Sequence, residues 1–181
     1  MGKIYCIMGK SSSGKDSIYR ELLARGQLSL KRIVPYTTRP ARENETPGET
    51  YVFCDERQAK ALEEAGRIVE LRAYNTVYGV WKYFTVDDGR IDLSKESYLY
   101  IVTLAGYQKI KEYFGNERTV PIYIEVDDGE RLFRALARER IQKEPMYGEM
   151  CRRFLADTED FSREKLAEAG IETRFVNENL E

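Results

Sequence analysis

Residues 9–17 have the types and spacing of a phosphate-binding loop, Gly9-Lys10-Ser11-Ser12-Ser13-Gly14-Lys15-Asp16-Ser17. The segment directly follows an apolar run, residues 4–8, and directly precedes a helical pattern that ends at Gly26. Two glycines five apart let backbone N–H groups converge on a phosphate, and the following helix adds the positive end of its dipole. Lys15 supplies an ammonium group for the outer phosphates. The segment therefore predicts a site for a nucleoside triphosphate.

One position departs from the usual loop. The residue after the lysine is normally Ser or Thr, whose hydroxyl holds Mg²⁺, whereas Asp16 follows Lys15 here and the first hydroxyl belongs to Ser17. Either the Asp16 carboxylate holds the metal, directly or through water, or ligation shifts to Ser17. Both alternatives keep Mg²⁺ in the site. A third is that Asp16 only stabilises the first turn of the helix, an effect worth about 0.3–1 kcal/mol.

A second cluster of polar residues could bind another phosphate. Arg39 and Arg42 lie three apart in a polar segment with threonines beside them, and Tyr51 follows soon after. Arginine pairs with phosphate oxygens through two parallel hydrogen bonds, so two such side chains on one loop could clamp a phosphate. Taken alone, the segment fits a solvated surface loop better than a phosphate site.

Composition limits the remaining possibilities. With 181 residues, 42% of them hydrophobic, the chain can bury one good core, and we expect a single domain. There are 29 basic and 31 acidic residues, so the net charge of −2 favours neither a nucleic acid nor a membrane as partner. The absence of histidine excludes Ser-His catalysis and a histidine-ligated metal. Three widely spaced cysteines predict reduced thiols and a cytoplasmic location. Monomer and homodimer both remain open.

Strand-like and helix-like segments alternate along the chain, which predicts an α/β fold with a parallel sheet flanked by helices. Between the two halves of this pattern we expect a small mixed α+β lobe, and near the end a helical lid. The expected core covers about residues 1–33, 95–136 and 155–181, the lobe about 34–94, and the lid about 137–154. Residues 28–36, at the border between core and lobe, read as a strand that ends at the Pro35 break, and residues 81–93 read as a β-hairpin that turns at Asp87-Asp88-Gly89.

The order of motifs resembles guanylate kinase, a P-loop kinase that phosphorylates GMP with ATP. The motifs are the phosphate loop, T-T-R-P-x-R at 37–42, G-x-x-Y-x-F at 48–53, Glu70, Tyr78-Gly79, and V-N-E-N-L at 176–180. They span most of the chain, and their order is more specific than the loop alone. The resemblance implies the P-loop kinase fold, ATP and Mg²⁺ as cofactors, and a small phosphate-bearing acceptor, GMP or a related molecule.

The resemblance also implies roles for individual residues. The residues that would hold ATP are Gly9, Ser11, Ser12, Ser13, Gly14, Lys15, Asp16, Ser17 and Asn177, with Asp16 and Ser17 also at the metal. The acceptor's phosphate would be held by Arg39, Arg42, Tyr51 and Tyr78, its base would face Glu70, and Thr103 would complete the acceptor site. The lid arginines Arg134, Arg138 and Arg153, together with Lys15, would stabilise charge on the transferred phosphoryl group.

Departures from the family cluster at the base pocket. Pro35 and Val80 stand where the family has hydroxyl residues that read guanine, and the strand-end carboxylates of the family are absent at Ile101 and Thr103. These changes predict weaker discrimination for guanine or a different acceptor. G-K-D-S in the loop, the missing carboxylates and Tyr-Gly-Val are similar to ribose 1,5-bisphosphate phosphokinases, which leaves a sugar-phosphate kinase as the alternative. A non-catalytic protein-binding module is disfavoured because Lys15 is retained.

Overall fold

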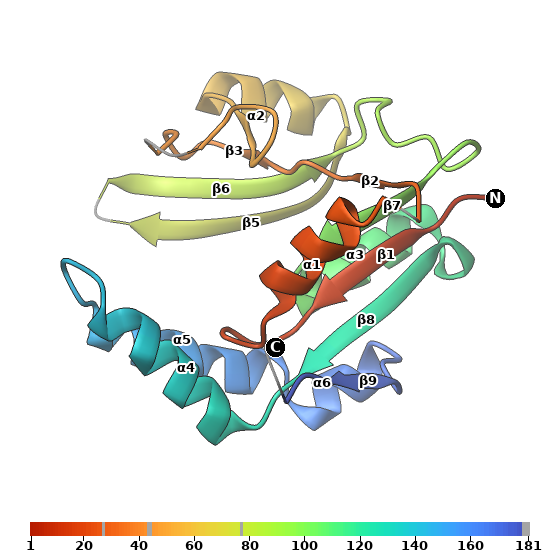
Figure 1. The fold of residues 1–181 in the computed structure, drawn as a ribbon. Coiled ribbons are helices and arrows are strands. Elements are labelled where there is room, and N and C mark those ends of the chain that lie inside the picture. Colours follow the sequence, from red (N-terminus) through yellow and green to blue (C-terminus); the bar gives the residue numbers. More distant parts are fainter. Residues whose placement is uncertain (27, 43–44, 77, 179–181) are drawn as a thin grey trace.

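The computed structural model describes residues 1–26, 28–42, 45–76 and 78–178. Its main sheet has five strands, all parallel, in the order β2-β7-β1-β8-β9 (Figure 1). The strands are β1 (Ile4–Met8), β2 (Leu30–Arg32), β7 (Ser97–Ile101), β8 (Thr119–Glu125) and β9 (Arg174–Val176). The predicted α/β fold with a parallel sheet is confirmed.

Both faces of the central strand β1 are covered, as parallel sheets require. Ile4, Cys6 and Met8 point to one face and pack with residues of α3 (Leu104–Phe114) and α6 (Arg163–Glu168). Ile7 points to the other face and packs with residues of α1 (Lys15–Ala24). This alternation explains why β1 is continuously apolar in sequence. It also fixes the end of β1, from which the phosphate-binding loop leaves the sheet.

A second sheet of four strands, in the order β4-β3-β6-β5, forms a separate lobe above the main sheet in Figure 1. Its strands are β3 (Tyr36–Thr37), β4 (Val52–Phe53), β5 (Ile68–Thr76) and β6 (Gly79–Val86), and α2 (Glu56–Glu64) covers one face through Ala59 and Leu62. Strands β3 and β4 are parallel, whereas the pairs β3/β6 and β5/β6 are antiparallel. The expected mixed lobe is therefore present.

Two helices, α4 (Asp128–Arg140) and α5 (Tyr147–Asp160), extend from the main sheet below the lobe (Figure 1). A short 3₁₀ helix, η1 (Asn116–Arg118), precedes β8. The lid expected at 137–154 comprises the end of α4, the connection and the first half of α5; its limits, like those of the core and lobe, stay a prediction. No helix in the described part of the chain has the length and hydropathy needed to cross a bilayer.

Two expectations for residues in the lobe and at its border were wrong. The hairpin does not turn at residues 87–89, because β6 ends at Val86 and Asp88 is held by the Tyr36 hydroxyl, at 2.6 Å, and by the Arg90 guanidinium. The turn of the hairpin lies instead between β5 and β6, after Thr76. Residues 28–36 are not one strand either. They contribute β2 to the main sheet and begin β3 of the second sheet, with the break at Pro35 between them.

Candidate functional site

The phosphate-binding loop lies between β1 and α1, and two glycines give it its shape. A Cβ on Gly9 would lie 2.6 Å from the carbonyl oxygen of Ile124, so only glycine fits beside β8. Gly14, the N-cap of α1, has φ +83°, a left-handed conformation that favours glycine. Ser12 also has a positive φ, +63°, which is uncommon for a residue with a side chain. Such backbone strain is typical of ligand-binding loops.

Ser13 is almost fully buried in this loop, and its hydroxyl has no hydrogen-bond partner among the described residues. Buried polar atoms are nearly always paired, so an unpaired one in a phosphate-binding loop fits a site that a ligand oxygen completes. Asn177 follows β9 and donates from Nδ2 to the Ser13 carbonyl oxygen at 2.9 Å. The structure thus brings Asn177 to the loop from the opposite end of the chain.

Lys15 and Asp16 form the first turn of α1 and contact each other, with 3.5 Å between Nζ and Oδ2. The Asp16 side chain is 72% exposed, and Ser17 is also exposed. Among the described residues, no group of three or more acidic, cysteine or histidine side chains could enclose a metal. One carboxylate and one hydroxyl, from Asp16 and Ser17, are donors compatible with Mg²⁺, which commonly takes one or two carboxylates and fills its shell with phosphate oxygens and water.

Two of the three expected lid arginines reach the loop. Arg138 on α4 donates from Nη2 to the Ser12 hydroxyl at 3.5 Å, and Arg153 on α5 donates to the Ser11 hydroxyl at 3.3 Å. These four side chains line one small pocket. Arg134 lies elsewhere.

Arg134 pairs with Glu130 at 2.7 Å and donates to the carbonyl oxygens of Asn177 and Glu178. It therefore faces the C-terminal segment, on the Asn177 side of the loop.

Arg131, which sequence analysis missed, ties the loop to both lid helices. Its side chain is 1% exposed, donates to the Ser11 carbonyl oxygen at 3.0 Å, and pairs with Asp128 of α4 and Asp157 of α5. Asp157 in turn accepts from the Ser11 N–H at 2.6 Å, and Lys10 pairs with Asp128 at 3.1 Å. Arg131 lies three residues before Arg134 and seven before Arg138, which puts it on the same helical face. This spacing could have identified Arg131 from the sequence.

On the lobe, Arg39 is 4% exposed and already engaged. Its Nη2 lies 2.7 Å from Glu45 Oε1, its Nη1 donates to the Pro40 carbonyl oxygen, and its guanidinium lies over the rings of Tyr51 and Phe53. The hydrogen bond from Arg39 holds the pKa of Glu45 below its ordinary value of 4.5. Arg39 Nε is buried and has no hydrogen-bond partner among the described residues.

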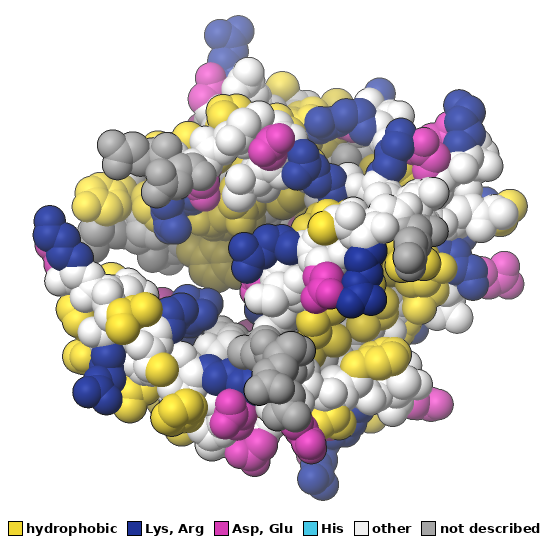
Figure 2. Space-filling model, viewed as in Figure 1, with side chains coloured by type: hydrophobic (Ala, Val, Ile, Leu, Met, Phe, Trp, Pro, Cys, Tyr) yellow, Lys and Arg dark blue, Asp and Glu magenta, His cyan; other side chains and the backbone are white. Residues whose placement is uncertain are grey.

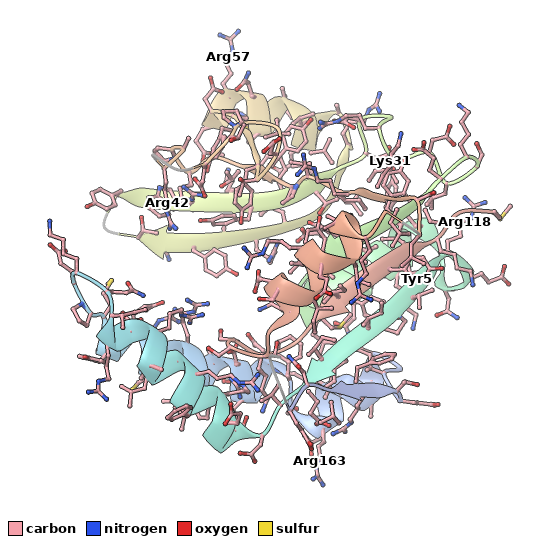
Figure 3. All side chains as sticks on the ribbon, viewed as in Figure 1. Tyr5, Lys31, Arg42, Arg57, Arg118 and Arg163 are labelled. Atoms are coloured by element: carbon pink, nitrogen blue, oxygen red, sulfur yellow. The ribbon has the colours of Figure 1, made fainter. Side chains whose placement is uncertain are left out.

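The other expected phosphate ligands of the lobe lie at different places relative to Arg39. Arg42 is exposed, and Figure 3 shows it on the lobe beside β6; its backbone N–H donates to Glu45 Oε2 at 2.8 Å. The Tyr51 ring packs edge-on against Tyr83 at 5.7 Å. Tyr78, 81% exposed at the start of β6, stacks on Trp81 and not on the Arg39 group. The structure therefore gathers Arg39 and Tyr51, with Arg42 nearby, and leaves Tyr78 apart.

Glu70 lies on the β5 face opposite α2, at the junction of the lobe with the main sheet. Its side chain is 1% exposed and receives hydrogen bonds from Arg72 and from Thr85, which the Tyr100 hydroxyl contacts in turn at 2.7 Å. Burial raises the pKa of Tyr100, so this hydroxyl stays protonated. Thr103 lies close by, but its hydroxyl caps α3 by accepting from the Gly106 N–H.

Arg72, Thr85 and Tyr100 were missed from the sequence. Burial by itself would lower the pKa of Arg72, but the neighbouring Glu70 carboxylate outweighs that effect and the pKa is raised. Two features could have indicated these contacts with Glu70. Arg72 is two residues after Glu70 and therefore on the same face of the strand, and Thr85 stands opposite Glu70 on β6.

Figure 2 shows a deep hollow between the lobe and the α4–α5 helices, with Lys and Arg side chains on its walls. The lid arginines Arg138 and Arg153 belong to the lower side, and β5 and β6 form the upper side. A site of this form can hold two phosphate-bearing molecules, one on the loop and one on the lobe.

Comparison with known proteins agrees with this geometry. A family model described as guanylate kinase matches residues 1–143. The guanylate kinase of Porphyromonas gingivalis is 28% identical over 183 residues, covering 99% of this chain and 91% of the relative. That of Thermotoga maritima is 32% identical over 124 residues, covering 68% and 57%. A crystal structure of guanylate kinase from Anaplasma phagocytophilum matches the fold with a TM-score of 0.64 at 24% identity, covering 98% of this chain and 78% of that one.

Proposed function

Because the chain belongs to the guanylate kinase family, a family of phosphotransferases that use ATP, we propose that it transfers the γ-phosphoryl group of ATP to the phosphate of a nucleoside monophosphate, with GMP as the reference acceptor. One observation carries the proposal. Arg138 and Arg153, from two different lid helices, both contact hydroxyls of the phosphate-binding loop. The backbone N–H groups and Lys15 are enough to bind a phosphate. Two further cations at the same loop are therefore expected only if negative charge develops there during phosphoryl transfer.

On the donor side, we assign the backbone N–H groups of the loop, Lys15 and the buried Ser13 hydroxyl to the triphosphate. Arg138 and Arg153 then stand where negative charge moves during transfer. Phosphoryl transfer depends mainly on positioning and on stabilising that charge, because little covalent chemistry is asked of the protein. Asn177, held against the loop, is assigned to the nucleoside side of ATP.

On the acceptor side, we assign the acceptor phosphate to Arg39, Arg42 and Tyr51. The unpartnered Nε of Arg39 supports this role, because it is a buried N–H that a phosphate oxygen would satisfy. Closing the lobe toward the lid helices would exclude water from the two phosphates. A phosphate acceptor is already an anion, so no general base is needed.

For the metal, we propose that Asp16 and Ser17 hold Mg²⁺ together with phosphate oxygens. Bound there, Mg²⁺ would neutralise charge on the outer phosphates. The exposed Asp16 carboxylate supports this assignment, and its contact with Lys15 supports the competing role of a purely local ion pair. We also propose that the chain works in the cytoplasm, which its three free cysteines support.

The proposal is tested by following ADP release from ATP and Mg²⁺ with AMP, GMP, CMP, UMP and ribose 1,5-bisphosphate as acceptors. We expect ADP release with a nucleoside monophosphate as acceptor. In Lys15→Ala the rate of ADP release should fall at least about a hundredfold, and the fold should stay intact because Lys15 lies in the loop and outside the core. Lys109→Ala, which removes an exposed lysine of α3, is the matched control. The proposal would be overturned if none of the nucleoside monophosphates supported ADP release, or if only the sugar bisphosphate did.

A further inference from the structure

The Glu70 carboxylate has almost no hydrogen-bonding capacity left for a ligand. Arg72 donates from Nε to Oε2 at 3.1 Å and from Nη2 to Oε1 at 3.3 Å, and the Thr85 hydroxyl donates to Oε1 at 2.8 Å. A carboxylate offers about four lone-pair sites. Three are taken, so Glu70 can accept about one further hydrogen bond, at Oε2.

Arg72 adds donors to the same place. A guanidinium has five N–H groups, and the described residues accept from two of those on Arg72. The side chain is 26% exposed, so part of it is accessible to a ligand. The Glu70–Arg72 ion pair, which is neutral as a whole, therefore offers several donors and one acceptor site.

Guanine does not match this arrangement. Its base-pairing edge carries the O6 acceptor, the N1–H donor and the N2 amino donor. A carboxylate that reads guanine through N1–H and N2–H needs two free acceptor sites, and Glu70 has one. The guanidinium of Arg72 would also face the amino group, donor against donor. A purine with a carbonyl oxygen at C2 removes both problems, because N1–H meets Glu70 and the oxygen accepts from Arg72.

We propose that Arg72 is a specificity-determining residue that makes the acceptor pocket select a purine monophosphate carrying a carbonyl oxygen at C2, the xanthine edge, over GMP. This inference rests on the proposed function, since it places the base of the acceptor beside Glu70. A second phosphate, as in a sugar bisphosphate, suits the pocket less well, because the Glu70 charge offsets that of Arg72.

The test compares three acceptors that differ at C2, with the accompanying change of protonation at N3 in xanthine: GMP, with an amino group; inosine monophosphate, with hydrogen; and xanthosine monophosphate, with a carbonyl oxygen. Both kcat/KM with ATP and the dissociation constant by calorimetry without ATP are measured for the unchanged protein, Arg72→Ala and Arg72→Gln. Each variant supplies its own ratio between acceptors, so a general loss of activity cancels. Arg57→Ala is the control, because Arg57 is a cation of the same lobe that points away from the hollow (Figure 3).

We expect the unchanged protein and Arg57→Ala to prefer xanthosine monophosphate to GMP by about ten- to a hundredfold, the range of one charge-assisted hydrogen bond. In both Arg72 variants the ratio should move toward GMP by about the same factor. A preference for GMP in the unchanged protein, or an unaltered ratio in both variants, would overturn the inference while leaving the kinase proposal intact. If no nucleotide accepted a phosphoryl group, the kinase proposal would be overturned. The ratio of the dissociation constants for GMP and xanthosine monophosphate would then still decide the inference about Arg72.

Discussion

Replacing Arg131 with methionine should destabilise the protein by about 3 kcal/mol. The side chain is 1% exposed, and its loss removes the ion pairs with Asp128 and Asp157, the hydrogen bond to the Ser11 carbonyl oxygen, and a guanidinium 4.7 Å from the centre of the Phe154 ring. Breaking a buried ion pair by removing one partner typically costs about 3–5 kcal/mol.

The lower end of this range applies because the partners left behind are not isolated. Asp128 is 47% exposed and keeps Lys10, and Asp157 keeps the N–H of Ser11. For a chain of this size, about 3 kcal/mol corresponds to a fall in Tm of roughly 6–12 °C. Urea unfolding and thermal melting both measure the effect.

The matched control is Arg152→Met, which removes an arginine of α5 that is 66% exposed and pairs with Glu149. A surface pair of this kind contributes at most about 1 kcal/mol. A cost below about 1 kcal/mol for Arg131→Met, or one equal to that of the control, would refute the role of Arg131 as the link between loop and lid.

Three further results are expected. Arg42→Ala should weaken acceptor binding at least about tenfold and leave ATP binding within twofold by calorimetry, since Arg42 is exposed on the lobe and is assigned only to the acceptor phosphate; equal losses for both ligands would contradict that assignment. Asp16→Asn should raise the Mg²⁺ concentration for half-maximal rate about tenfold, or about 1.4 kcal/mol, if the carboxylate holds the metal, whereas an unchanged requirement with slightly lower stability would favour a purely helical role. Because the pKa of Glu45 is lowered in the folded protein, its ion pair with Arg39 stabilises the fold above about pH 4.5 and the stabilisation is lost as the pH falls through the folded pKa. The free energy of urea unfolding should therefore differ more between the unchanged protein and Glu45→Gln at pH 6 than at pH 3, and a constant difference would exclude the linkage.

The features predicted well from the sequence are those set by short-range patterns. The loop at 9–17 follows from glycine spacing, and the capping box of Asp55 and Gln58 starts α2 at Glu56. The parallel sheet follows from the alternation of strands and helices. In each case the residues that decide the structure lie within a few positions of one another.

The errors arose where distant contacts decide the structure. Asp87-Asp88-Gly89 has the composition of a hairpin turn, but Tyr36, 52 residues away from Asp88, holds that segment in another path. Arg131 was missed because its burial depends on Ser11 and Asp157, which lie 120 and 26 residues away in the sequence.

At the base pocket, the sequence identified the missing hydroxyls and carboxylates but not what replaces them. The engagement of Glu70 by Arg72 is visible only when β5 is in place against α3, because the contact depends on side-chain direction and burial as well as on spacing. The roles assigned to individual site residues stay predictions until they are tested by substitution.

The most direct test is to identify the bond that the protein forms. Phosphorus NMR of a mixture of the protein, ATP, Mg²⁺ and either GMP or xanthosine monophosphate distinguishes the possible products. We expect signals of ADP and of a nucleoside diphosphate to grow together in equal amounts, and neither to appear with Lys15→Ala. Inorganic phosphate growing in place of the nucleoside diphosphate, or no change with either acceptor, would contradict transfer to a nucleoside monophosphate.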